Sequence, residues 1–364
     1  MRRVPLVLVM AVGPKECLGA LELLDSARVF LEGPYRMVIV DDSGELGTWR
    51  ALARYPEVDI LHNWRRRGFR HLLASLQRAY RHVLRRYDFD AVLKVDTDAL
   101  ITGPGLDRDI LAAVRADPNL GMAGSRSWPE RDDPQWRRRM EESMATWGPI
   151  IERAERHGYQ RGESVLGGAY VLSRRCLAAI DSAGFLRLRP KGTRIAEDVT
   201  FSLFVRAVGY EIQELAGPTQ PFALAYRGLP IPPREILARG KKIIHSVKLS
   251  PSDLVIRAIF TRNRRRALER PGTPGPDVSR TIALAKRTAR VCAWLRWRSV
   301  GALALRQDRP RRARRIFRRC AAIGPANVEV WLGLAGSWLP TWLLLPLRWL
   351  RRYSVLALDR LGRR

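Results

Sequence analysis

Cysteine and histidine are scarce in this sequence, with four and five copies in 364 residues. The cysteines lie far apart and form no C-x-x-C pair: Cys17, Cys176, Cys292 and Cys320. This scatter argues against a disulfide framework and against a structural zinc site with the usual ligand spacing. A reducing, cytoplasmic compartment fits it best.

Acidic residues are few relative to basic ones, 36 against 65, which gives a formal net charge of +29. Residues 1–250 hold 39 basic and 30 acidic side chains, whereas residues 251–364 hold 26 and 6. The C-terminal third would therefore attract polyanions, either nucleic acid or anionic lipid headgroups. Because it has no zinc-finger or RNP-type motif, we expect peripheral association with an anionic membrane and no specific nucleic acid.

Long apolar runs are also rare. The start, MRRVPLVLVMAVGP, imitates a signal peptide, but its apolar run is only about nine residues and no clean A-x-A-like site follows, so it predicts a first strand. Residues 330–347 carry no charge, yet two prolines and three tryptophans favour an interfacial or partly inserted segment. We predict a protein at the inner face of the cytoplasmic membrane; whether 330–347 enters the bilayer or packs on the preceding domain stays open.

Strands and helices alternate over the first 250 residues. Apolar runs predict strands at 4–12, 36–40 and 91–95, and apolar residues at helical spacing predict helices at 15–31 and 68–87. This order implies an α/β fold with a mostly parallel sheet flanked by helices. Less regular signals predict a further strand at 121–125, helices at 134–157 and 196–208, and irregular chain at 218–233, while residues 165–173 form an apolar run with a central Gly-Gly.

The chain is thus expected to have two parts, a domain at 1–250 and a basic, tryptophan-containing helical extension at 251–364. Arg-rich helices are predicted in the extension at 281–298 and 310–323.

Carboxylates follow several of the predicted strands. Three D-x-D pairs occur, and only Asp96 with Asp98 comes directly after a buried-strand pattern, AVLKV; the pairs at 88 and 90 and at 107 and 109 are interpreted as surface acids. Ligands bind at the carboxyl ends of strands in open α/β sheets, so this pair is the candidate for binding.

Four elements occur in a fixed order: VIVDDSG, AVLKVDTDAL, GGAYVLSRRCL with AEDVTFSLF, and IIHSVK. Together, over residues 4–250, they resemble the GT-A nucleotide-sugar glycosyltransferases. The first resembles bacterial glycosyltransferase family 2, and the third resembles the inverting fringe-like β-1,3-glycosyltransferases. The sequence lacks the Q-x-x-R-W segment of family 2, which argues against processive polysaccharide synthesis.

This resemblance implies a GT-A (Rossmann-like) fold and a metal-dependent, inverting transfer from a UDP-sugar to a glycan or lipid-linked acceptor in cell-envelope synthesis. Mn²⁺, or Mg²⁺ in its place, suits carboxylate and imidazole ligands. By similarity Asp98 binds the metal, Asp96 contacts the ribose or a metal-bound water and stands with the metal ligands, and His245 completes the coordination sphere.

The same resemblance assigns roles to further residues. Asp198 is the candidate general base. Proximity to a helix N-terminus is expected to favour its ionised form. The donor-binding set comprises Asp41 and Asp42 at the uracil or ribose, Lys248 at a phosphate oxygen, Gly167 and Gly168 where the backbone approaches the sugar, together with Lys94 and Asp96.

Plainer interpretations stay open for each element taken singly. Asp41-Asp42-Ser43-Gly44 is typical of a turn, Glu197-Asp198 of a helix N-terminus, and His245 of an ordinary strand histidine. The alternatives for the whole chain are a retaining glycosyltransferase and a nucleic-acid-binding protein with a degenerate transferase domain. A nucleotidyltransferase is disfavoured because the sequence has no Gly-rich, lysine-bearing N-terminal loop.

Overall fold

The computed structural model describes residues 1–63, 72–127, 134–188, 195–248 and 251–268, together with residues 315 and 318. The chain divides into two compact units, Met1–Val278 and Ser279–Arg364. The segment 330–347 lies outside the described residues, as do the predicted helices at 281–298 and 310–323 apart from residues 315 and 318. No helix among the described residues is long and apolar enough to cross a membrane.

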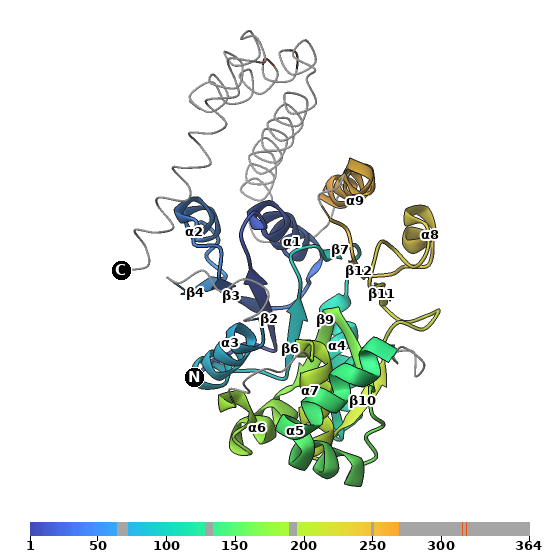
Figure 1. Ribbon diagram of the computed structural model, residues 1–364. Helices are drawn as coiled ribbons and strands as arrows, with labels where there is room; N and C mark the ends of the chain where they lie inside the picture. Colours follow the sequence, from blue (N-terminus) through green and yellow to red (C-terminus); the bar gives the residue numbers. More distant parts are fainter. Residues whose placement is uncertain are drawn as a thin grey trace, which may run out of the picture. The chain divides into compact units, whose positions relative to one another are not determined.

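A sheet of seven strands forms the centre of the first unit (Figure 1). Neighbouring strands are parallel except at β9, which is antiparallel to both β6 and β8. The predicted α/β class with a mostly parallel sheet is therefore confirmed, although no sequence pattern indicated the reversal at β9. In spatial order the strands are β4 (Val58–His62), β3 (Tyr35–Asp41), β2 (Leu6–Val12), β6 (Ala91–Val95), β9 (Ser164–Ser173), β8 (Leu120–Ser127) and β10 (Glu211–Glu214).

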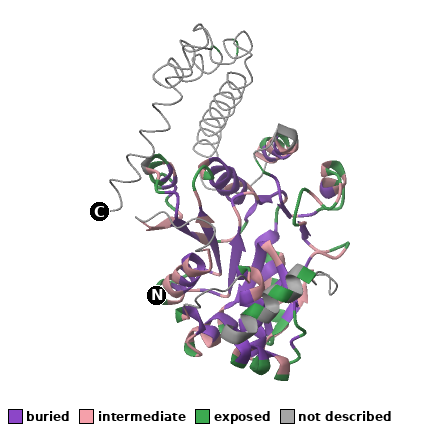
Figure 2. Cartoon of the chain, viewed as in Figure 1, coloured by how far each residue is buried: buried purple, intermediate pink, exposed green. Residues whose placement is uncertain are grey.

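Helices cover this sheet, and its inner strands are buried along most of their length, whereas the edge strands β4 and β10 are partly exposed (Figure 2). On one face Val7 and Val9 of β2 share a core with Leu76 and Tyr80 of α3, while Leu6 and Leu8, which alternate with them, are buried as well. Burial of both faces explains the unbroken apolar sequence of β2. The helices that contribute to this core are α3 (Leu72–Arg86), α5 (Pro134–Arg156), α6 (Arg174–Ser182) and α7 (Glu197–Ala207).

The remaining elements of the Rossmann-like part are short except for two helices. The predicted helix at 15–31 is confirmed as α1 (Cys17–Phe30), and α4 (Leu106–Ala116) follows the D-x-D turn. The others are α2 (Leu46–Leu52), the 3₁₀ helix η2 (Phe185–Arg187), and a two-stranded parallel sheet of β1 (Arg2–Arg3) and β5 (Tyr87–Asp88).

A second sheet of three strands completes the unit. In it β12 (Ile243–His245) lies between β11 (Phe222–Leu224), which is parallel to it, and β7 (Leu100–Ile101), which is antiparallel. The segment 218–233, predicted to be irregular, thus contains a strand. Because Ile244 pairs with Leu100, the pairing brings His245 beside the chain that follows Asp98.

The last two described helices flank this second sheet: α8 (Pro233–Ala238) and α9 (Pro251–Leu268). Ile256 and Phe260 of α9 pack in one core with Leu100 and Ile244 of the sheet. The helix that begins just beyond residue 250 is therefore part of the first unit and packs on its second sheet.

The two other D-x-D pairs serve structural purposes. Asp88 and Asp90 form ion pairs with arginines, including Arg3, and Asp109 pairs with Lys242 at 2.6 Å. The prediction of a surface acid is wrong for Asp107, which is buried. Its carboxylate accepts hydrogen bonds from the backbone N–H groups of residues 32 and 33, which compensate the burial.

Close packing joins α1 to the turn between Asp96 and Asp98. A Cβ on Gly19 of α1 would lie 2.2 Å from the backbone carbonyl oxygen of Thr97. Only glycine therefore allows the helix to approach this turn so closely.

We predict that Gly19→Ala destabilises the protein by about 1–3 kcal/mol, because the backbone of the turn must move to accept the methyl group. Urea unfolding of the purified protein measures this change. The matched control is Gly47→Ala in α2, where a Cβ meets nothing within 4 Å; it should be neutral or stabilising by up to about 1 kcal/mol. Equal effects of the two substitutions would contradict the close contact.

Candidate metal centre

Two carboxylates stand at the end of the central strand β6. The strand is fully buried, and the chain turns directly after Val95, where the N–H of Ala99 donates to the carbonyl of Asp96 at 3.1 Å. The N–H of Asp96 donates to the carbonyl of Gly168 on the neighbouring strand β9 at 2.9 Å. The turn therefore delivers both acidic side chains to the carboxyl end of the sheet, as the sequence predicted.

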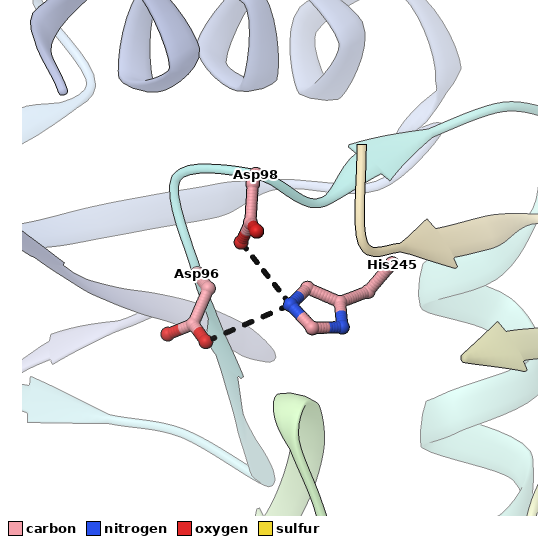
Figure 3. Close-up of side chains that lie close together, drawn as sticks. All are labelled: Asp96, Asp98 and His245. Carbon is pink, nitrogen blue, oxygen red and sulfur yellow. Dashed lines mark ion pairs between the residues drawn. The ribbon is translucent and has the colours of Figure 1, made fainter. Parts of the chain in front are cut away.

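Asp96, Asp98 and His245 come together at this end (Figure 3). Nε2 of His245 lies 3.1 Å from Oδ1 of Asp98 and 3.9 Å from Oδ2 of Asp96. One ligand atom from each residue lies within 4.8 Å of the others. The structure thus brings together two residues of one turn and a third that follows almost 150 positions later.

Each of these three side chains is fixed through its other polar atom. Oδ1 of Asp96 accepts a hydrogen bond from Lys94 at 2.6 Å, Oδ2 of Asp98 accepts one from Ser246 at 2.8 Å, and Nδ1 of His245 donates to the carbonyl of Ala225 at 3.0 Å. The atoms left over are the ones that converge. Such outer partners orient ligands and set the histidine tautomer in metal sites.

The donor set fits a divalent cation. Two carboxylate oxygens and one imidazole nitrogen suit Mn²⁺, and the carboxylates also suit Mg²⁺. Three protein ligands fill only part of the octahedral coordination that Mg²⁺ prefers. The remaining positions would be open to oxygens of a bound phosphate.

The environment keeps Asp98 ionised. Burial alone would raise the pKa of its carboxyl group, but the hydrogen bond and charge of His245 outweigh burial, with help from Ser246 and Lys248, and lower the pKa to about 2. The exposed Lys248 thus lies close enough for its charge to act on the carboxylate of Asp98. For Asp96, burial raises the pKa against the attraction of Lys94.

Lys94 occupies a different place from the one predicted for a donor-binding residue. Its side chain is 0% exposed, and its ammonium donates to Asp96, to the carbonyl of Gly167 and to Glu197 at 3.2 Å. Burial would lower the pKa of Lys94, but the carboxylates of Asp96 and Glu197 raise it. With its donors engaged by the protein, Lys94 neutralises and positions the acids.

Two glycines on β9 allow the site to close. A Cβ on Gly168 would lie 2.1 Å from Cγ of His245, and one on Gly167 would lie 2.9 Å from Glu197 and 3.0 Å from Asp198. The resemblance to glycosyltransferases predicts that these glycines make room for a sugar. Their immediate neighbours are the imidazole ring and the two acids at the start of α7.

Asp198 stands on the other side of this glycine pair, at the first turn of α7. One of its oxygens accepts the N–H of Val199 at 2.8 Å, and the N–H of Gly167 also donates to the carboxylate. Burial and the charge of Glu197 nevertheless raise the pKa of Asp198 to about 7. The backbone donors at the helix N-terminus do lower the pKa of Asp198, but burial and the charge of Glu197 outweigh them.

Asp41 and Asp42 lie at the end of β3 in a polar network of their own. Asp41 accepts hydrogen bonds from the N–H and Oγ of Ser43, at 3.0 and 2.5 Å, and from Nδ1 of His62 at 3.0 Å. Asp42 accepts from Ser75 at 2.6 Å and from the amide of Asn63. The bond to the N–H of Ser43 is the turn that the plainer interpretation expected.

The sequence assigned no role to three contributors to the site. Ser246 and the carbonyl of Ala225 hold ligand side chains, and Glu197 holds Lys94. Ser246 stands next to His245 in the sequence, which is the one local signal that could have indicated it. The partners of Ala225 and Glu197 depend on tertiary packing that no local pattern reveals.

No family model and no curated protein matches the sequence of this chain. Distant likenesses to solved structures do occur. The mannosyltransferase PcManGT from Pyrobaculum calidifontis, in complex with GDP-Man and Mn²⁺, is 16% identical with a TM-score of 0.39, over 92% of this chain and 79% of that one.

Two others are the bifunctional glycosyltransferase WbbM in its apo form and the galactosyltransferase LgtC with donor and acceptor sugar analogues. WbbM is 12% identical with a TM-score of 0.41, over 78% of this chain and 52% of that one. LgtC is 10% identical with a TM-score of 0.41, over 75% of this chain and 99% of that one.

We predict that Lys94→Met destabilises the protein by about 3–5 kcal/mol, because two acids lose their buried counter-charge. Urea unfolding measures the loss, and adding Glu197→Gln should recover part of it. The control is Lys242→Met, which breaks the more exposed pair with Asp109 and should cost at most about 1 kcal/mol. Equal losses for the two lysines would show that Lys94 is not the required counter-charge.

Proposed function

We propose that this chain is a metal-dependent glycosyltransferase of the GT-A type that transfers a sugar from a UDP-sugar with inversion. The observation that carries the proposal is the convergence of one ligand atom each from Asp96, Asp98 and His245 within 4.8 Å. The ordered resemblance of the sequence to GT-A enzymes supports it. Asp198, held at the same glycine pair, supplies a group suited to proton transfer.

In this proposal Asp98, His245 and Asp96 hold Mn²⁺ or Mg²⁺, which as a Lewis acid would stabilise the charge that develops on the diphosphate leaving group. Lys248 contributes further positive charge near the phosphates. Asp41 and Asp42, at the end of β3, bind the uracil or ribose. Lys94 holds Asp96 in the orientation that leaves Oδ2 free.

Asp198 acts as the general base that removes the proton from the acceptor hydroxyl. A base is most effective when its pKa lies near the working pH, and burial together with Glu197 brings Asp198 to about 7. Inversion follows from a single displacement in which the acceptor oxygen attacks the face opposite the leaving group.

The acceptor proposed is a glycan or a lipid-linked sugar of the cell envelope. Support comes from the charge distribution, because the basic C-terminal third suits an anionic membrane face. Residues 251–364 would then keep the enzyme where its acceptor is made.

The first test is a thermal-shift panel of UDP- and GDP-sugars with and without Mn²⁺. A donor that binds raises the Tm by mass action. We predict that Asp98→Asn keeps the metal-free Tm within a few degrees but loses the Mn²⁺-dependent shift and turnover, because an amide supplies no charge for the cation.

Asp109→Asn is the matched control, since it makes the same change in a D-x-D pair outside the site. It should retain the shift and the turnover. Full turnover by Asp98→Asn would refute the metal role, and a shift with GDP-sugars alone would correct the donor class.

We predict that Asp198→Asn binds donor and Mn²⁺ normally but transfers sugar about 10²–10⁴ times more slowly, because it lacks the base. In the wild type kcat/KM should rise with pH through about 7, since the ionised form of Asp198 is the active one and accumulates above its pKa. Steady-state kinetics against pH measure both effects.

Glu197→Gln should move this rise to lower pH, because the charge of Glu197 helps to raise the pKa of Asp198. NMR of the product reports the anomeric configuration. Near-normal transfer by Asp198→Asn would remove it from the base role, and retained configuration would exclude single displacement.

A further inference from the structure

The segment that follows His245 is fixed to the turn of the metal centre through its backbone. The N–H of Val247 donates to the carbonyl of Asp98 at 2.8 Å, and the N–H of Ser246 donates to the carbonyl of Gly228 at 2.8 Å. Since Ser246 also holds the carboxylate of Asp98, any shift of residues 246–248 would be felt at two of the three ligands.

Arg257 of α9 contacts the backbone carbonyls of the segment 246–248. Its guanidinium donates to the carbonyl of Val247 and, through Nε at 3.2 Å, to the carbonyl of Lys248. It also forms an ion pair with Glu22 of α1. Arg257 is 1% exposed and Glu22 is 5% exposed, so the pair is buried.

The rest of α9 keeps Arg257 in place. Ile256 and Phe260, on either side of it in the sequence, pack against the second sheet. The side-chain amide of Asn263 donates to the carbonyl of Thr102 at 2.9 Å, and Arg264 donates to the backbone carbonyl of Glu22 at 3.3 Å. The helix is therefore anchored both to the second sheet and to α1.

A buried ion pair is a weak source of stability, because apolar residues of similar size often replace it without loss. Apolar residues, however, cannot form directional hydrogen bonds to backbone carbonyls. The planar guanidinium holds one carboxylate and two successive carbonyls at fixed angles, a task that a lysine ammonium does poorly. Arg257 is therefore suited to fixing the backbone that carries Ser246 and His245.

We propose that Arg257 is a positioning residue for the metal centre: braced by Glu22, it fixes the carbonyls of Val247 and Lys248 and thereby the ligand His245. The proposal rests on the metal role of the site given above. It makes α9 part of the working site, although the helix lies beyond the segment that resembles glycosyltransferases.

The test compares Arg257→Met with Arg264→Met in the full-length protein. Both remove a buried arginine of α9 that bonds to residue 22, but only Arg257 touches residues 247 and 248. Electron paramagnetic resonance of free Mn²⁺ measures the affinity, and urea unfolding without metal measures stability. We expect Arg257→Met to weaken Mn²⁺ binding about tenfold or more, as losses of outer partners do, and Arg264→Met to leave it within about twofold.

A second readout needs no metal. The imidazole ¹⁵N signals of selectively labelled histidines report the tautomer and surroundings of His245 in the metal-free protein. Arg257→Met should change the His245 signals, whereas Arg264→Met should not. If Arg257→Met does not fold, Arg257→Lys replaces it in the comparison, because lysine keeps the charge but lacks the planar guanidinium group. Its effects on the His245 signals and on Mn²⁺ affinity should be smaller but in the same direction.

Equal Mn²⁺ affinities for both variants, or losses that follow stability alone, would overturn the proposal, as would unchanged His245 signals. Failure of the wild type to bind Mn²⁺ would refute the metal role instead. In that case the histidine signals still decide whether Arg257 positions His245.

Discussion

The buried ammonium group of Lys94 is the contact on which the candidate site depends. A charge without exposure to water is tolerated only if opposite charges and hydrogen bonds surround it. Its partners come from three elements: Asp96 from the turn after β6, the carbonyl of Gly167 from β9, and Glu197 from α7. Neutralising one lysine therefore draws together the turn, the glycine pair and the helix that carries Asp198, and it selects which oxygen of Asp96 stays free.

The other half of the site comes from the second sheet. Pairing of β12 with β7 sets His245 beside the turn, and Ser246 and Val247 then bond to Asp98. Neither sheet holds a complete ligand set by itself. The candidate metal centre lies where the two sheets meet, so its geometry depends on the packing of the elements behind them, α1 against the turn and α9 against the second sheet.

Local patterns in the sequence were sufficient for some features and insufficient for others. Apolar runs and helical spacing predicted the main strands and helices, and the order of motifs brought Asp98 and His245 together correctly. The three D-x-D pairs, however, have the same spacing but different structural surroundings. The burial of Asp107, for example, depends on backbone donors some 75 positions away. The direction of β9 and the partners of Lys94 likewise depend on long-range pairing, which no short stretch records.

The surroundings of two aspartates in the site shift their pKa values in opposite directions. Asp98 faces an imidazole and a hydroxyl donor, which outweigh burial and lower its pKa to about 2, whereas burial and a neighbouring carboxylate raise that of Asp198 to about 7. A carboxylate that stays ionised suits a cation, and one that exchanges its proton near neutrality suits proton transfer. Gly167 and Gly168, which have no side chains, lie between the surroundings of Asp98 and those of Asp198. A side chain there would displace either the imidazole or the acids, so the proposed division of roles rests on the absence of two Cβ atoms as much as on the charges.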